Sequence, residues 1–82
     1  MAVADRRYDD ARPRLEAALT RMDGRPPGER SHAERLLAET CLALRDDTAA
    51  ARYASAALAD AGQAGDAALV AQARGVLGIV LR

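Results

Sequence analysis

The chain has 82 residues, half of them apolar, with 12 basic and 12 acidic side chains and a formal net charge of zero. Alanine dominates the apolar class and strand-forming residues are scarce, so the composition predicts one small all-α domain. Local start and stop signals divide it into about four helices, and an internal repeat predicts that they form an array of antiparallel helical hairpins. Because the charges are balanced and interspersed, we expect no direct binding to nucleic acid or to an anionic membrane.

Other sequence features indicate the cellular compartment and limit the chemistry that the protein can perform. The first ten residues contain no apolar core of signal-peptide length, and the single cysteine, Cys41, cannot form an internal disulfide. The longest apolar run, Ala67 to Leu81, is too short to cross a bilayer and contains Arg74. We therefore expect a cytoplasmic protein with no membrane segment, no cofactor and no metal site, since the Cys and His residues lack metal-ligand spacing.

The first helix is expected to begin at Asp9 or Asp10 and to run to Met22. An aspartate can cap its first turn, and Pro13 fits that turn because the backbone N–H groups there have no helical acceptor. The segment DGRPPGER, residues 23–30, then ends the helix with two glycines and two prolines.

The second helix is expected to open at Ser31 and to continue to about Arg45. Ser31 and Glu34 have the spacing of a capping box, in which each side chain hydrogen-bonds the backbone N–H of the other residue. Such a box would place both side chains at the exposed start of a helix.

The third and fourth helices carry acidic start signals. Asp46 and Asp47 are candidate N-caps for the third helix, which is expected to end near Ala61, with Gly62 in the left-handed conformation. Asp66 is the expected N-cap of the fourth helix, which continues to the last residue.

Two pairs of segments repeat each other. At an offset of 39 residues, ARPRLEAAL (11–19) aligns with AARYASAAL (50–58), and at an offset of 40 Leu37 aligns with Leu77, Ala38 with Gly78 and Cys41 with Leu81. A period near 40 built from paired helices predicts a stacked helical array. Residues 9–22 would be a second-helix half-repeat, 31–61 a full hairpin and 66–82 a first-helix half-repeat.

These residues resemble a tetratricopeptide repeat. Leu37-Ala38 and Leu77-Gly78 stand where that family has a Leu-Gly-like pair, and Ala50 and Ala57 match its small–x6–small pattern in the second helix. The period and the Gly65-Asp66 pair are most similar to degenerate repeats in LuxR-type and antibiotic-regulatory transcription regulators of actinobacteria. The chain departs from the family pattern in three ways: Cys41 replaces an aromatic residue, Arg45 replaces the turn glycine, and the proline that commonly ends the second helix is absent, with Gly62 nearby.

The resemblance implies that the first helix of each pair lines a groove for a peptide or a partner helix. On this chain the partner-groove residues would be His32, Arg35, Glu39, Leu42 and Gln72, with Ile79 continuing the surface. The spacing of the first four places them on one helix face. The alternative is that His32, Arg35 and Glu39 form a solvated face with a weak ion pair.

Catalysis is not expected. His32 is the sole histidine, and no motif positions a nucleophile beside it, so we assign no catalytic residue and predict that the protein is not an enzyme. Cys41 falls at a position expected to face a neighbouring helix, where it would be a small buried hydrophobe with no reactive role.

The last predicted helix carries a broad apolar stripe, and three explanations compete for what covers it. A homodimer, a heteromeric partner, or a chain cut from a longer protein could each account for it, and we favour the homodimer. The expected function is a self-associating protein–protein interaction module; the alternatives are a helical sensor fragment of a larger transcription regulator and a small helical-bundle ligand-binding protein or enzyme. The self-association residues would be Leu69, Val76, Leu77, Val80 and Leu81.

Overall fold

The computed structural model describes the backbone of residues 2–81 and the side chains of residues 7–81. Met1 and Arg82, the outer bounds of the predicted domain, lie outside the described residues. Within the described range the chain forms helices and no strand, which confirms the all-α prediction. The four helices are α1 (Ala2–Thr20), α2 (Pro27–Ala43), α3 (Asp47–Ala64) and α4 (Ala67–Val80).

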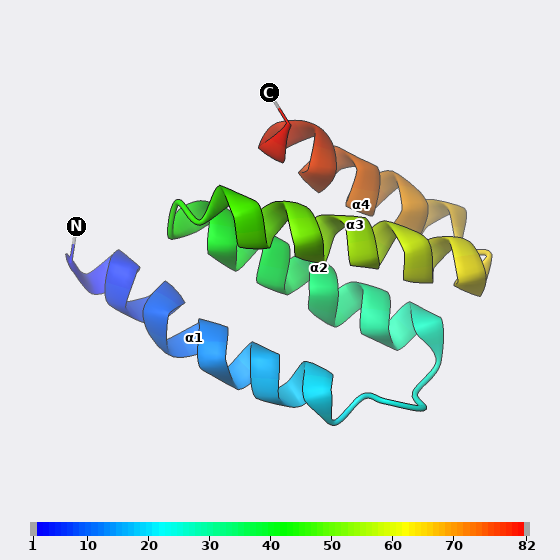
Figure 1. The fold of residues 1–82 in the computed structure, drawn as a ribbon, viewed down its shortest axis with the longest axis horizontal. Helices are drawn as coiled ribbons and strands as arrows, with labels where there is room; N and C mark the ends of the chain where they lie inside the picture. The colour runs from blue at the N-terminus through cyan, green and yellow to red at the C-terminus, as the bar shows by residue number, and fades with distance from the viewer. Residues whose placement is uncertain (1, 82) are drawn as a thin grey trace.

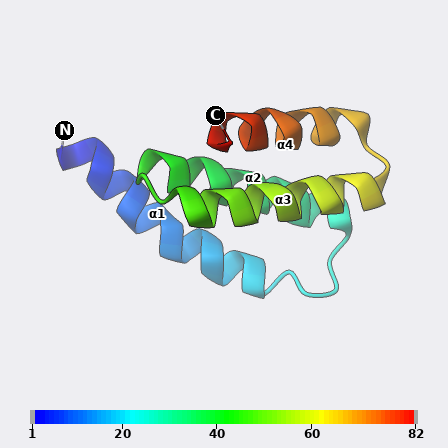
Figure 2. The same cartoon turned by 45° about the horizontal axis from the view of Figure 1, so that its top comes forward.

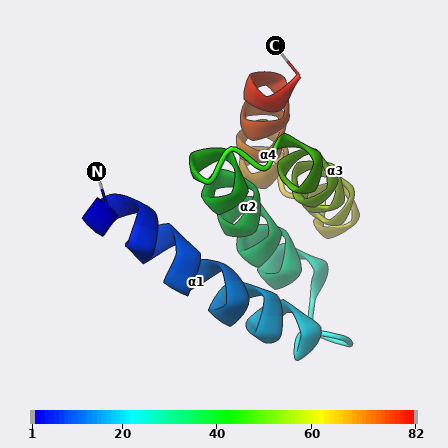
Figure 3. The same ribbon diagram turned by 60° about the vertical axis from the view of Figure 1, so that its left-hand side comes forward.

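The antiparallel pair of α2 and α3 forms the centre of the molecule (Figure 1). The helix α4 folds back along α3 and also touches α2, whereas α1 packs its backbone against α2 alone among the described helices. As Figures 2 and 3 show, α1 and α4 therefore lie on opposite sides of the central pair. The start of α1, the turn between α2 and α3 and the end of α4 lie at one end of the molecule.

The core is made mainly of alanine. On α3, four alanines spaced four, three and four residues apart are completely buried, with 0% exposure: Ala50, Ala54, Ala57 and Ala61. On α2, Leu37, Ala38 and Cys41 are equally inaccessible, so Cys41 is buried as expected. Because alanine extends only a methyl group, the backbones of the two helices can approach closely and fill the space between them.

The first helix is longer at its N-terminus than predicted. It begins at Ala2, so neither Asp9 nor Asp10 starts it, and Pro13 lies in its interior. The carbonyl of Asp9 loses its helical donor to this proline. Asp9 is exposed, so water can take the place of that donor. The helix ends at Thr20, two residues before the predicted Met22.

The predicted capping box between Ser31 and Glu34 is wrong. The helix α2 starts one turn earlier, with Pro26 as the N-cap and Pro27 as its first residue, a position where a proline needs no hydrogen-bond acceptor. Both box residues are consequently inside the helix and buried. The Ser31 hydroxyl instead donates a hydrogen bond of 2.8 Å to the carbonyl oxygen of Ala57 on α3.

The turn between α2 and α3 contains a strained residue. Arg45 has φ of 62°, in the left-handed region. Its N–H donates to the carbonyl of Leu42 (3.0 Å), and the N–H of Asp46 donates to the carbonyl of Cys41 (2.8 Å). These two bonds form a Schellman motif, whose left-handed position is normally glycine. Arg45 thus holds a glycine conformation at the position where the resembled family has a turn glycine.

The predicted aspartate N-caps of α3 and α4 are confirmed, whereas the predicted end of α3 is wrong. The Asp46 carboxylate accepts the N–H of Ala49 at 3.2 Å, and the Asp66 carboxylate accepts the N–H groups of Ala68 and Leu69 at 3.0 and 3.2 Å. The helix α3 continues past Ala61 and Gly62 to Ala64, and the left-handed residue is Gly65 with φ of 67°. Gly62 can lie inside α3 because glycine lowers the stability of a helix without preventing its hydrogen bonds.

We predict that Arg45→Gly raises the free energy of unfolding by about 1 kcal/mol, because glycine adopts the left-handed conformation without a Cβ clash. Urea unfolding followed by circular dichroism measures the change. The control is Arg52→Gly at an exposed site within α3, which should lower the free energy of unfolding by about 1 kcal/mol. A loss of stability in Arg45→Gly would contradict the assigned turn geometry.

Candidate interaction surfaces

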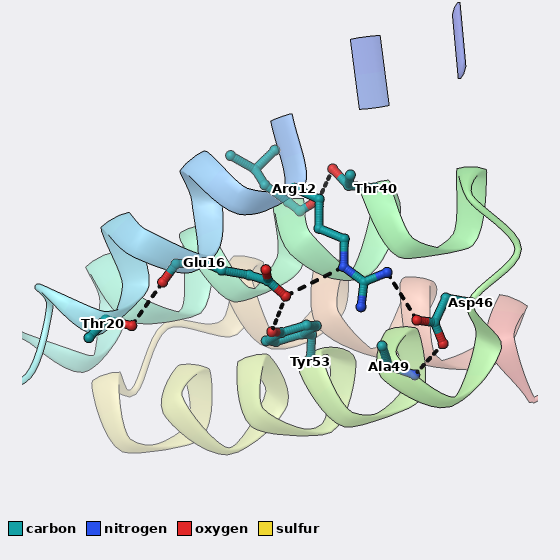
Figure 4. A network of polar contacts seen from close by, with 8 residues as sticks. Arg12, Glu16, Thr20, Thr40, Asp46, Ala49 and Tyr53 are labelled. Carbon is teal, nitrogen blue, oxygen red and sulfur yellow. Dashed lines mark hydrogen bonds and ion pairs between the residues drawn. The ribbon is translucent and has the colours of Figure 1, made fainter. Parts of the chain in front are cut away.

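A chain of polar side chains joins α1 to α3 and to the turn before it (Figure 4). One oxygen of Glu16 accepts the Tyr53 hydroxyl at 3.1 Å and the Nε–H of Arg12 at 3.4 Å. The Arg12 guanidinium also pairs with the second carboxylate oxygen of Asp46 at 3.0 Å. The hydrogen bond from Ala49, with help from Arg12, lowers the pKa of Asp46. The network fixes the position of α1 along the central pair of helices.

Three of the predicted partner-groove residues form a chain on the surface of α2. The Arg35 guanidinium hydrogen-bonds Glu39 one turn later, and its other terminal nitrogen lies 3.3 Å from Nδ1 of His32 one turn earlier. His32 and Glu39 are exposed and Arg35 is half-buried. The three residues share one face, as the spacing predicted. Because the charged groups pair with each other, this part of the face has the character of a solvated surface.

The other predicted groove residues do not join this chain. Leu42 is half-buried and packs against the core residues Ala38 and Cys41. Gln72 and Ile79 are exposed on α4. The structure therefore brings together three polar residues of the predicted groove, leaves Gln72 apart on α4 and directs Leu42 into the core.

A hollow of about 860 Å³ lies where the end of α1, the start of α2 and the start of α4 meet. Of the predicted groove residues, His32 alone lines it. Sequence reasoning missed the hollow because it depends on the six-residue connection between α1 and α2, whose path no periodicity defines. The lining residues are Ala18, Arg21, Met22, Arg25, Pro26, Gly28, Glu29, His32, Asp66 and Leu69.

The predicted self-association residues separate into buried and exposed groups. Val76 is only 8% exposed and packs against Ala38 and Ala54, so it belongs to the core of the chain and not to a free surface. Leu77 and Val80 are half-buried against the same core, and Leu69 is half-buried near the hollow. The open part of the α4 face includes Leu81, which is 71% exposed, and Ile79, which is 56% exposed.

Two glycines lie on the open part of α4. A Cβ atom added at Gly75 or Gly78 would meet no heavy atom within 4 Å outside the neighbouring backbone. Within residues 2–81, therefore, no helix uses the close approach that these glycines permit. The exposed surface at the end of α4 combines two large apolar side chains with two positions that have no side chain.

A buried carboxyl pair between α2 and α3 is a feature that the sequence reasoning missed. Glu34 is only 4% exposed, and one of its oxygens has no hydrogen-bond partner. Burial, together with the neighbouring carboxyl of Asp60, raises the pKa of Glu34 to about 8, and the nearby Arg30 opposes this shift. Nε of Arg30 lies 3.7 Å from Asp60. The spacing of Glu34 from Ser31, Leu37 and Cys41 was the available signal, because all four share one helix face.

Comparisons of the sequence with protein-family models and curated proteins, and of the fold with solved structures, find no match. Among residues 2–81, no helix combines the length and the apolar character required to cross a membrane. Over the same described residues, no group of three or more His, Cys, Asp or Glu side chains is arranged to hold a metal ion.

We predict that the free energy of unfolding falls as the pH rises from 5 to 8.5. The folded chain keeps the Glu34 proton up to about pH 8, whereas the unfolded chain releases it near 4.5. The folded state therefore binds more protons across this window, and its advantage is lost as the pH increases. At about 1.4 kcal/mol per pH unit over nearly three units, we expect a loss of roughly 4 kcal/mol, measured by urea unfolding at several pH values.

Glu34→Gln should remove most of this pH dependence, because an amide stays neutral throughout. The matched control is His32→Gln, an exposed change on the same helix, which should leave the dependence in place. An unchanged pH profile in Glu34→Gln would show that the buried carboxyl is not its source.

Proposed function

We propose that the protein is a protein–protein interaction module of the tetratricopeptide-like kind, which associates with a second copy of itself through the exposed end of α4, a homodimer being the simplest product. The observation that carries this proposal is the exposure of Ile79 and Leu81, at 56% and 71%, beside two open glycines. Each of these exposed apolar side chains would gain stability from burial against a partner.

The order of packing supports a repeat architecture. The helix α3 contacts α2 on one side and α4 on the other, and α4 also reaches α2. Each inner helix thus touches the elements adjacent to it in sequence, the arrangement that stacked helical hairpins adopt. The internal sequence match at offsets of 39 and 40 residues supports the same proposal.

The small apolar area of the core also supports the proposal that the chain binds a partner. Much of the buried surface consists of alanine methyl groups, and the apolar area that each contributes is small. At about 25 cal/mol per Å², such a core stabilises a domain of this size only modestly. Covering the two exposed side chains at the end of α4 in an interface would add to that stability.

We predict that Ile79→Lys combined with Leu81→Lys abolishes self-association. Lysine near the end of a helix interacts favourably with the helix dipole, so the fold should persist while the apolar contact is lost. Light scattering should give the wild type a mass above 8.7 kDa that rises with concentration, and the double variant the mass of one chain. We choose these residues over Leu77 and Val80 because the latter pack on the core.

The control is Gln63→Lys, which adds the same charge to an exposed site in the last turn of α3. This variant should associate as the wild type does. A wild-type chain that stays monomeric at the highest accessible concentration would refute the proposed function.

A further inference from the structure

The repeat relates the outer helices to the inner ones. At an offset of 39 residues α1 corresponds to α3, and at an offset of 40 α4 corresponds to α2. The two inner helices make the most extensive contact in the molecule. The two outer helices carry related sequences but lie on opposite sides of the chain and do not pack against each other.

Burial on α1 is incomplete at the positions that α3 buries fully. Four alanines of α3 are 0% exposed because α2 and α4 both pack on α3. The corresponding residues are all half-buried, since α2 covers them from one side. These residues are Ala11, Leu15 and Ala18 on α1 and Met22 in the connection that follows it.

Burial on α4 is likewise incomplete at positions that α2 buries fully. Leu37, Ala38 and Cys41 are 0% exposed on α2 because α3 covers them. Their counterparts on α4 are Leu77, which is half-buried, Gly78, which is exposed, and Leu81, which is 71% exposed. Within residues 7–81, both outer helices are thus only partly covered on the face that corresponds to the contact between α2 and α3.

The sizes of the uncovered residues match across the two faces. In the core, Ala38 of α2 and Ala54 of α3 belong to one buried cluster. The counterpart of Ala38 is Gly78, which is smaller, and the counterpart of Ala54 is Leu15, which is larger. A contact between Gly78 and Leu15 would therefore compensate the loss of volume on one helix with a gain on the other.

The directions of the helices also agree. The end of α4 and the start of α1 lie at the same end of the molecule as the turn that joins α2 to α3 (Figure 1). A second copy displaced sideways could therefore place its α1 antiparallel to α4, starting where α4 ends. This is the relation that α3 has to α2.

We propose that α4 of one copy packs against α1 of a second copy in the way that α2 packs against α3, so that copies associate head to tail. This inference rests on the proposed self-association and specifies the partner surface. Such a contact joins two different faces, so repetition gives a ring or an open array, unlike a symmetric contact between two α4 helices.

The proposed contact has one electrostatic signature. The counterparts of the buried Glu34 and the half-buried Asp60 are Arg74 on α4 and Arg21 just after α1, both exposed. These like charges would lie near each other across the interface and weaken it. Salt screens such repulsion, so association should strengthen as the ionic strength rises.

The test uses variants that block one face each. Gly78→Arg blocks α4 and should leave the fold intact, because the site is open and arginine has a higher helix propensity than glycine. Leu15→Arg blocks α1, and Ala11→Arg serves as a second α1 variant if the first loses helical circular dichroism. Gly62→Arg is the matched control, since it makes the same change at an open site on α3.

Each blocked variant alone should be monomeric by light scattering, and an equimolar mixture of an α4-blocked and an α1-blocked variant should form a complex of one copy of each. Arg74→Glu should tighten wild-type association about two- to fivefold, and adding Arg21→Glu should reverse that gain. The Gly62→Arg control should associate like the wild type.

Two results would overturn the inference while leaving the proposed function in place. The first is an α1-blocked variant that keeps its helical signal and still self-associates, which would indicate contact between two α4 helices. The second is a mixture of the blocked variants that remains monomeric. A monomeric wild type would instead refute self-association itself.

Discussion

The close contact between α2 and α3 is the interaction on which the rest of the fold depends. Four alanines of α3 are completely buried there, and they allow the two backbones to approach more closely than larger side chains would permit. Both α1 and α4 are positioned by packing on this pair. Replacing one of these alanines with a larger residue would separate the helices and also displace what rests on them.

Polar contacts define how the helices are placed along one another. A uniform alanine surface offers few features that distinguish one register from the next. The hydrogen bond from Ser31 to the carbonyl of Ala57 and the bond from Tyr53 to Glu16 each require one particular alignment. Alanine methyl groups therefore set the distance between the helices, and a few hydroxyl groups set their register.

The sequence predicted the class of the fold, the four helices and the caps at Asp46 and Asp66, because these depend on local chemistry. It failed at Ser31 and Glu34, where the same residues satisfied a local capping pattern and a buried helix face. The Pro26-Pro27 pair decided between the two by starting α2 a turn earlier. For the site, the spacing correctly grouped His32, Arg35 and Glu39, and the ion pair was anticipated as the alternative to a groove, but the spacing could not show that Leu42 and Val76 turn inward.

Asp46 joins three parts of the chain through three different groups. Its N–H closes the end of α2, one carboxylate oxygen caps α3, and the other oxygen holds Arg12 of α1. Opening the turn at this residue would loosen contacts of all three helices at once. The consequence is cooperativity: one residue at the surface adds a coupling between the first three helices to the one that their thin core provides.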